Sequence, residues 1–222
     1  HPDAIITYRA SDMVLALHSD ASYLSVSQAR SRAGGHFFMS ENDDEPRNNG
    51  AVLTIAQIIK AVMSSAAEAE LGGLYINSRE AVPIRHLLNE MGHKQPPTPV
   101  QTDNSTALGV VKSTIQPRRT KAMDMRFYWL RDRINQAQFR TYWKAGPTNN
   151  GDYHTKHHSA VHHQSVRPVF LTAIGKLTQF RRQAKNCQSH NAHCKGVLDM
   201  VSGIPVLMGQ RTFGEHWQLY RR

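Results

Sequence analysis

The stretch MVLALHSDASYLSVSQARSRAGGHFFM (residues 13–39) begins and ends with apolar residues, with a polar run rich in Ser, Ala and Arg between them. Residues 14–18 and 35–39 have the composition of extended segments, so this stretch predicts two strands joined as a hairpin. Residues 41–50 form a polar, turn-forming insert, and the β-branched residues 51–59 predict a third strand. Three consecutive strands indicate an antiparallel meander.

The chain changes to helical sequence after Ser64. Residues 64–92 contain a Ser cap, the helix-forming residues Ala, Glu and Leu, and Gly92 as a stop signal. Pro83 lies inside this stretch and has no backbone donor, so we expect a break or kink there. The stretch predicts the first helix of the fold.

Strands and helices alternate after this helix. The pattern predicts a strand at residues 100–102, helices at 106–115 and 116–136, a strand at 139–146 and a last helix at 153–164. This order indicates an α+β fold whose mixed sheet gains its parallel part from the later, helix-linked strands.

Three segments are expected along the chain. Residues 1–12 form an N-terminal connecting segment, and residues 13–165 form the folded domain. Beyond them the periodicity weakens, and residues 171–222 carry eight Lys or Arg against two acidic residues. We therefore expect residues 166–222 to be a poorly ordered basic tail.

The net charge predicts an anionic partner. The 222 residues include 27 Lys and Arg against 17 Asp and Glu, a formal charge of +10 at pH 7. Such an excess favours binding to nucleic acid through release of counterions. No stretch reaches the roughly 18 consecutive apolar residues of a membrane span, so we expect no membrane partner.

The cysteines and the first residue bear on where the protein acts. Two cysteines, Cys187 and Cys194, are too few for a disulfide framework, which favours a reducing, intracellular compartment. The chain begins with His1 instead of Met, which suggests a piece of a longer polypeptide.

Four carboxylates fall where predicted elements end or turn: Asp20, Glu70, Asp103 and Asp152. Mg²⁺ prefers oxygen ligands, and a metal-dependent phosphodiesterase needs several carboxylates that converge from different elements. The alternative is that Asp20 is a turn residue, that Asp103 and Asp152 cap helices, and that Glu70 is solvated.

Six segments in order resemble the ribonuclease H domain of copia-type retrotransposon polyproteins. They are HSDAS (18–22), SRAGGHFF (31–38), SSAAEAELGGL (64–74), TDNSTAL (102–108), RRTKAMDMRFYWLRD (118–132) and NGDYHTK (150–156). The resemblance covers about residues 8–160 and implies a ribonuclease H-like mixed five-stranded sheet flanked by helices. Ala67, Ala122 and Tyr128 depart from the family pattern, and none of them removes a carboxylate.

The resemblance implies that Asp20, Glu70, Asp103 and Asp152 bind two Mg²⁺ or Mn²⁺ ions and cleave the RNA strand of RNA–DNA hybrids. The implied partner is the reverse transcriptase domain of the same polyprotein, and the implied location is a cytoplasmic particle or the nucleus. A non-catalytic remnant that only binds nucleic acid is the alternative.

Helix geometry distinguishes Glu68 from Glu70. At about 100° per residue, two residues two positions apart point in nearly opposite directions, so only one of them can enter a site. We choose Glu70, because ELGGL (70–74) resembles the Glu-Leu-x-Ala pattern by which this family packs its first helix, with Gly73 at the contact with the sheet. We then expect Glu68 to face solvent or form a salt bridge.

The predicted helix at residues 116–136 is rich in Lys and Arg, and we expect it to contact the phosphate backbone of a nucleic acid. Its side chains Phe127 and Leu130 should point inward and its basic residues outward. Asn104 and Ser105, next to Asp103, are placed to hydrogen-bond the hybrid. The predicted phosphate contacts are Arg118, Arg119, Lys121 and Arg126.

Overall fold

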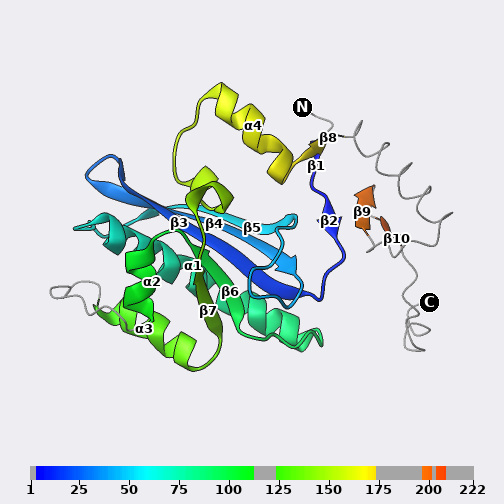
Figure 1. Ribbon diagram of the computed structural model, residues 1–222, viewed down its shortest axis with the longest axis horizontal. Helices are drawn as coiled ribbons and strands as arrows, with labels where there is room; N and C mark the ends of the chain where they lie inside the picture. Colours follow the sequence, from blue (N-terminus) through cyan, green and yellow to red (C-terminus); the bar gives the residue numbers. More distant parts are fainter. Residues whose placement is uncertain (1–3, 113–123, 174–196, 202–203, 209–222) are drawn as a thin grey trace. The chain divides into compact units, whose positions relative to one another are not determined.

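Figure 1 shows the computed structural model, which describes residues 4–112, 124–173, 197–201 and 204–208. The chain divides into two compact units. The larger unit consists of residues 11–165, and the smaller one combines residues 1–10 with 166–222.

A five-stranded mixed sheet forms the larger unit, in the order β5-β4-β3-β6-β7. Three antiparallel strands, β3 (Val14–Val26), β4 (Arg30–Ser40) and β5 (Ala51–Ile59), form the predicted meander. The strands β6 (Thr98–Thr102) and β7 (Phe139–Trp143) extend the sheet in parallel with β3. The α+β class and the mixed five-stranded sheet are confirmed.

The β3–β4 hairpin is longer than the sequence predicts. Both strands continue through the polar run, and the turn contains Gln28 and Ala29 with φ values of 59° and 52°. The pairing is irregular between Ser22 and Val26, where Leu24 also has a positive φ. Strand pairing uses main-chain groups, so polar side chains do not end it.

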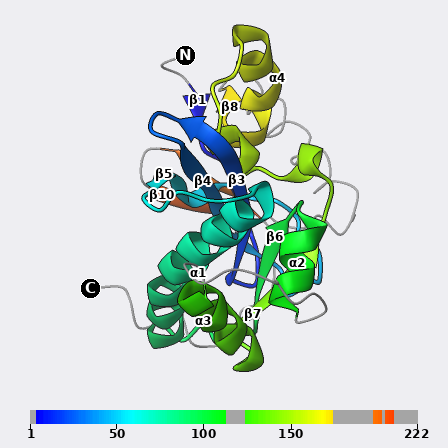
Figure 2. The ribbon, with the colours of Figure 1, turned by 90° about the vertical axis from the view of Figure 1, so that its left-hand side faces the viewer.

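The long helix α1 (Ala66–Glu90) covers β3, β4 and β5, and α3 (Asp124–Asn135) lies beside it (Figure 2). The predicted break at Pro83 is wrong, because α1 is one helix from end to end. Arg85, two residues later, is buried and donates to the main-chain oxygen of Pro96 at 2.7 Å. Packing of this kind outweighs the loss of one helical hydrogen bond.

Two other helices begin and end at residues different from those predicted. The helix α2 (Ser105–Val111) is capped by Asn104, whose side-chain oxygen accepts from Ala107 N at 2.9 Å. The predicted helix at 153–164 is wrong in its limits, since the short 3₁₀ turn η2 (Asp152–His154) precedes α4 (Ala160–Phe170). The Ser159 hydroxyl accepts from His162 N at 3.3 Å, so this serine caps α4 and sets its start.

The smaller unit contains short strands. β1 (Ala4–Ile5) pairs with β8 (Thr172–Ala173), and β2 (Tyr8–Arg9) pairs with the hairpin of β9 (Val197–Val201) and β10 (Ile204–Met208). The sequence pattern did not predict these strands. Most of residues 166–222 lies outside the described part of the chain, so the expected poorly ordered tail and the segment limits stay predictions.

The core of the larger unit lies between the sheet and α1. Leu15 and Leu17 of β3, Phe37 of β4, Val100 of β6 and Leu74 of α1 are fully buried in it. Among the residues that the structure describes, no helix has both the length and the apolar character needed to cross a bilayer.

Gly73 is the point of closest approach between α1 and β3. A Cβ atom at this position would lie 3.0 Å from Asp20 O and 3.2 Å from Ala21 Cβ. The predicted sheet contact of Gly73 is therefore confirmed. At the neighbouring Gly72, a Cβ would meet only the side chains of Ile59 and Met63, at 3.3 Å or more.

These two glycines provide a matched test of the helix–sheet contact. Gly→Ala inside a helix gains about 1 kcal/mol of helix propensity at either site. Gly73→Ala should also force α1 away from a strand backbone, an overpacking cost of about 1–3 kcal/mol. We therefore expect Gly73→Ala to be less stable than Gly72→Ala by about that amount in urea unfolding. Equal stabilities would show that the contact is not tight.

Candidate metal centre

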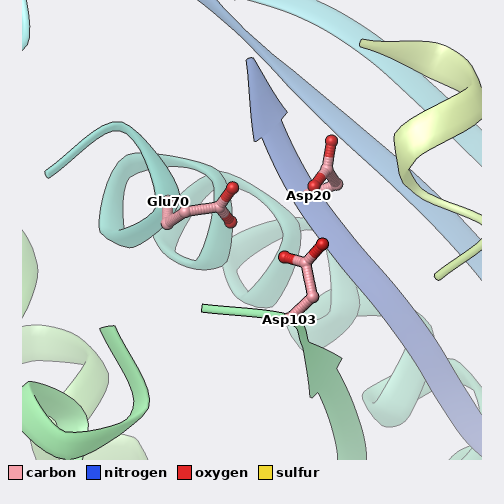
Figure 3. A group of neighbouring side chains, drawn as sticks. All are labelled: Asp20, Glu70 and Asp103. Carbon is pink, nitrogen blue, oxygen red and sulfur yellow. The ribbon is translucent and has the colours of Figure 1, made fainter. Parts of the chain in front are cut away.

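Three acidic side chains from three elements meet at one end of the sheet. Asp20 lies within β3, Glu70 lies near the start of α1, and Asp103 follows β6 (Figure 3). One carboxylate oxygen from each lies within 4.8 Å of the other two. Their carboxylates point toward one another in Figure 3.

The parallel pairing of β3 and β6 aligns the two aspartates. His18 is the register partner of Gln101, and Asp20 and Asp103 each lie two residues further along. Side chains two residues apart in a strand share a face, so the register directs both carboxylates to the same place. The sheet itself therefore positions two of the three acids.

The helix brings the third acid. Glu70 precedes the Gly73 contact by three residues, about one turn of helix, so it lies on the same face of α1. The main-chain nitrogen of Ala21 donates to Glu70 Oε1 at 3.2 Å. The close approach at Gly73 thus holds Glu70 beside Asp20.

Burial and mutual repulsion disfavour ionisation of these carboxylates. Burial, partly offset by a hydrogen bond from Thr155 and reinforced by the charges of Asp103 and Asp152, raises the pKa of Asp20 to about 6. Burial, together with the charges of Asp20 and Asp103, raises the pKa of Glu70 to about 9. Burial also raises the pKa of Asp103. The charge of Lys156 acts in the opposite direction, but all three pKa values remain raised.

A divalent cation fits this donor set. Glu70 Oε2 is buried and has no hydrogen-bond partner among the described residues. Mg²⁺ and Mn²⁺ prefer carboxylate oxygens, and a bound cation would compensate the charge that burial and repulsion penalise. Asp103 is partly exposed, so the cluster has a side that solvent reaches.

The alternative structural roles of these three residues do not hold. Asp20 lies within a paired strand and Glu70 is buried, so the first is not a turn residue and the second is not solvated. Asn104, not Asp103, caps α2. Neither capping nor solvation therefore explains these three acids.

Asp152, the fourth predicted acid, lies outside the group of three. It is the first residue of η2, and its carboxylate forms an ion pair with Lys156, four residues later. Its charge still raises the pKa of Asp20 and of Asp103. Burial opposes the charge of Lys156, but its hydrogen bond and ion pair with Asp152 outweigh burial and raise its pKa. The structure thus brings together three of the four predicted acids and sets the fourth beside a lysine.

Glu68 points away from the cluster, as helix geometry requires, but the expectation that it faces solvent is wrong. It is buried, and its carboxylate accepts from the main-chain nitrogen of Ser64 at 2.5 Å and from the Ser64 hydroxyl. Its own main-chain nitrogen donates to the Ser65 hydroxyl at 3.2 Å. Glu68 therefore takes part in a variant of the capping box, in which Ser65 caps the Glu68 nitrogen but the Glu68 carboxylate accepts from Ser64, the residue before the cap. The Ser-x-x-Glu spacing from Ser65 to Glu68 is visible in the sequence.

The loop before η2 is hydrogen-bonded to β3 through Asn149 and His18, whose roles were not predicted from the sequence. The side-chain nitrogen of Asn149 donates to Ser19 O at 2.9 Å, and its oxygen accepts from Gly151 N at 3.0 Å. His18 Nδ1 accepts from Asn150 N at 3.2 Å. Burial and the nearby charges of His36 and Lys144 lower the pKa of His18 to about 3, so it stays a neutral acceptor. A lone Asn or His in a sequence carries no signal of such a role.

The predicted nucleic-acid contacts are only partly described. Arg118, Arg119 and Lys121 lie outside the described residues. In α3, Phe127 and Leu130 are buried, as predicted. The guanidinium groups of the helix lie over aromatic rings: Arg126 over Tyr75, Arg131 over Phe127 and Arg133 over Trp129.

Other polar and aromatic groups border Asp103. The oxygen of Asn104 is used by its helix cap, so a contact with substrate would come from its amide nitrogen. Ser105 is exposed. Trp143 is half exposed, and its indole nitrogen donates to Asp103 O at 2.8 Å. The sequence analysis missed this tryptophan.

The chain is similar to known proteins in sequence and in fold. No protein-family model matches the chain. Over 151 residues it is 24% identical to a retrovirus-related Pol polyprotein from transposon TNT 1-94 of Nicotiana tabacum. That match covers 68% of this chain but 11% of the polyprotein. The predicted resemblance to a retrotransposon polyprotein is confirmed by this sequence match.

Solved structures of RNase H proteins are also similar. The N-terminal RNase H domain of a Mycobacterium tuberculosis protein superposes with a TM-score of 0.44 and 14% identity, covering 64% of this chain and 91% of that one. LC11-RNase H1, isolated from compost and crystallised with an RNA/DNA hybrid, gives a TM-score of 0.47 and 8% identity, covering 64% and 93%.

The raised pKa of Glu70 predicts how stability varies with pH. The unfolded side chain ionises near its ordinary pKa of 4.5, whereas the folded one keeps its proton up to about 9. Between pH 7 and 9 the folded state therefore binds more protons, and the metal-free protein should lose about 1.4 kcal/mol per pH unit. Denaturant titrations with chelator should show this slope.

Glu70→Gln should flatten the slope, because glutamine does not ionise. Glu68→Gln, two residues away and outside the cluster, should retain it. Saturating Mg²⁺ should also abolish the slope, because the cation stabilises the ionised carboxylate. A Glu70→Gln variant with the slope of the parent protein would show that Glu70 is not the group responsible.

Proposed function

We propose that this chain is a metal-dependent endoribonuclease that cleaves the RNA strand of RNA–DNA hybrids during retrotransposon reverse transcription. The observation that carries the proposal is the convergence of Asp20, Glu70 and Asp103 within 4.8 Å, with Asp20 and Glu70 buried and Asp103 partly exposed to solvent. The order of the six copia-type motifs supports the same assignment.

Asp20, Glu70 and Asp103 would hold the cations. Asp152 would complete the set when its carboxylate leaves Lys156, and its ion pair with that lysine keeps it partly exposed at the edge of the site. Two bound Mg²⁺ or Mn²⁺ ions would supply activation of water and stabilisation of negative charge at the scissile phosphate. The products would carry a 5′-phosphate and a 3′-hydroxyl.

The residues around the cluster would orient the hybrid. The amide nitrogen of Asn104 and the hydroxyl of Ser105 are one and two residues from Asp103, within reach of sugar hydroxyls and phosphates. Arg126 would contact the backbone, as would Arg118, Arg119 and Lys121. A formal charge of +10 supports such contacts.

The polyprotein context supports an intracellular site of action and a reverse transcriptase domain as the partner. The chain spans 11% of the length of the Pol polyprotein that it matches. In that setting the nuclease would remove RNA from the hybrid that a polymerase makes, and the polymerase would deliver the substrate.

Cleavage of a hybrid with labelled RNA tests the proposal. The parent chain should cut the RNA with Mg²⁺ and leave it intact with chelator. Asp20→Asn and Glu70→Gln should each reduce the rate at least about 100-fold, equivalent to about 2.7 kcal/mol in the barrier, because they remove a ligand charge. Glu68→Gln should cleave like the parent, because this acid lies outside the cluster.

Binding and cleavage can be separated with the same variants. Asp20→Asn should bind the hybrid as tightly as the parent or more tightly, since it removes a carboxylate that repels phosphate. Hybrid binding without cleavage by the parent chain would favour a non-catalytic nucleic-acid-binding protein. Cleavage retained in Asp20→Asn would contradict the role given to that residue.

A further inference from the structure

Thr155 contacts Asp20 of the candidate metal centre and the η2 turn that carries Asp152. Its hydroxyl oxygen lies 2.7 Å from Asp20 Oδ2 and 2.9 Å from Asp152 O, and its one hydrogen is donated to the nearer acceptor, the Asp20 carboxylate. Its main-chain nitrogen donates to Asp152 O at 3.1 Å. Thr155 is 1% exposed and Asp20 is 3% exposed, so water does not compete for this hydrogen bond. A single buried side chain thus joins the η2 turn to the acid on β3.

The position of the hydroxyl is fixed from several sides. The Ser22 hydroxyl donates to Thr155 O at 2.8 Å. The Thr155 methyl group fills the space beside Gly34, where a Cβ atom would lie 2.6 Å from Thr155 Cγ2 and 2.3 Å from Gly151 O. Because Gly34 is the register partner of Asp20, the methyl packs directly beside the acid.

A carboxylate rotates about its last bond unless an oxygen is held. In Figure 3, one oxygen of Asp20 points toward Glu70 and Asp103, and the other points away. A hydroxyl bound to one oxygen fixes the rotation and leaves the second oxygen for a cation. It also stabilises the ionised form, which is the form that binds a metal.

We propose that Thr155 is a positioning residue that orients the Asp20 carboxylate for a divalent cation and holds the Asp152 turn against the metal centre. The inference rests on the proposed function, because it assigns a supporting residue to the same site. The hydroxyl provides the orientation, and the methyl group provides packing against Gly34.

Two substitutions separate the role of the hydroxyl from the role of the methyl group. Thr155→Val keeps the shape but removes the donor, whereas Thr155→Ser keeps the donor and removes the methyl group. The probe is Mn²⁺ or Mg²⁺ alone, and the readout is the metal concentration that produces half of the metal-induced rise in melting temperature. Thr155→Val should raise this concentration about 10- to 100-fold, and Thr155→Ser should keep it within about twofold of the parent.

The hybrid-cleavage assay adds a second readout. At saturating metal, Thr155→Val should lower kcat and leave KM for the hybrid close to the parent value, because the residue is buried and does not face the substrate. Ser22→Ala, which loosens the turn without touching the bond to Asp20, should change the metal midpoint less than Thr155→Val. If Thr155→Val does not fold, Thr155→Cys replaces it, since a thiol is a weak donor, and should show the same rise.

The outcomes distinguish a failure of the proposed metal centre from a failure of the role given to Thr155. If neither Mg²⁺ nor Mn²⁺ stabilises the parent chain, the metal centre and the proposed function fail together with this inference. If the parent responds and Thr155→Val has the same midpoint, only the role of Thr155 is wrong. Equal weakening in the Val and Ser variants would also overturn it, because packing would then explain the effect.

Discussion

The repulsion among three carboxylates whose oxygens lie within 4.8 Å of one another is the constraint on which the rest of the site depends. Each would be more stable in water, and their raised pKa values express that cost. Two features of the fold hold the carboxylates together against this repulsion. They are the parallel register of β3 and β6 and the contact of α1 with β3 at Gly73. Both features belong to the packed core, so the acids cannot separate without disturbing it.

Lys156 brings positive charge near the cluster, because its charge acts to lower the pKa of Asp20, Glu70 and Asp103. Its ammonium group forms an ion pair with Asp152, which lies outside the group of three. Arg126, Arg131 and Arg133 lie over aromatic rings of α1 and α3. An acidic centre with arginines kept on separate elements is suited to hold cations at one place and phosphates at another.

Much of this arrangement was predictable from the sequence, because it follows from local patterns. Strand periodicity and the Ser cap of α1 predict the sheet and the first helix. The two-residue spacing of Glu68 and Glu70 shows that only one of them can face the site, and the family resemblance of ELGGL selects Glu70. Predictions failed where tertiary contacts override a local rule. Helix α1 continues through Pro83 because buried residues on both sides pack, and Ser159 delays the start of α4. The roles of Asn149 and His18 arise from residues about 130 positions apart in the chain and leave no local pattern.

Three glycines surround Asp20, and this has a consequence for how such a chain can lose its chemistry. Gly34 is its register partner, Gly73 approaches its carbonyl oxygen, and a Cβ at Gly151 would lie 3.0 Å from its nitrogen. A side chain at Gly73 or Gly151 would press on Asp20, and one at Gly34 would press on Gly151 and Thr155, while every acid remained in the sequence. In a lineage under relaxed selection, an intact set of acidic residues is therefore insufficient evidence of a working enzyme, and these glycines have to be inspected as well.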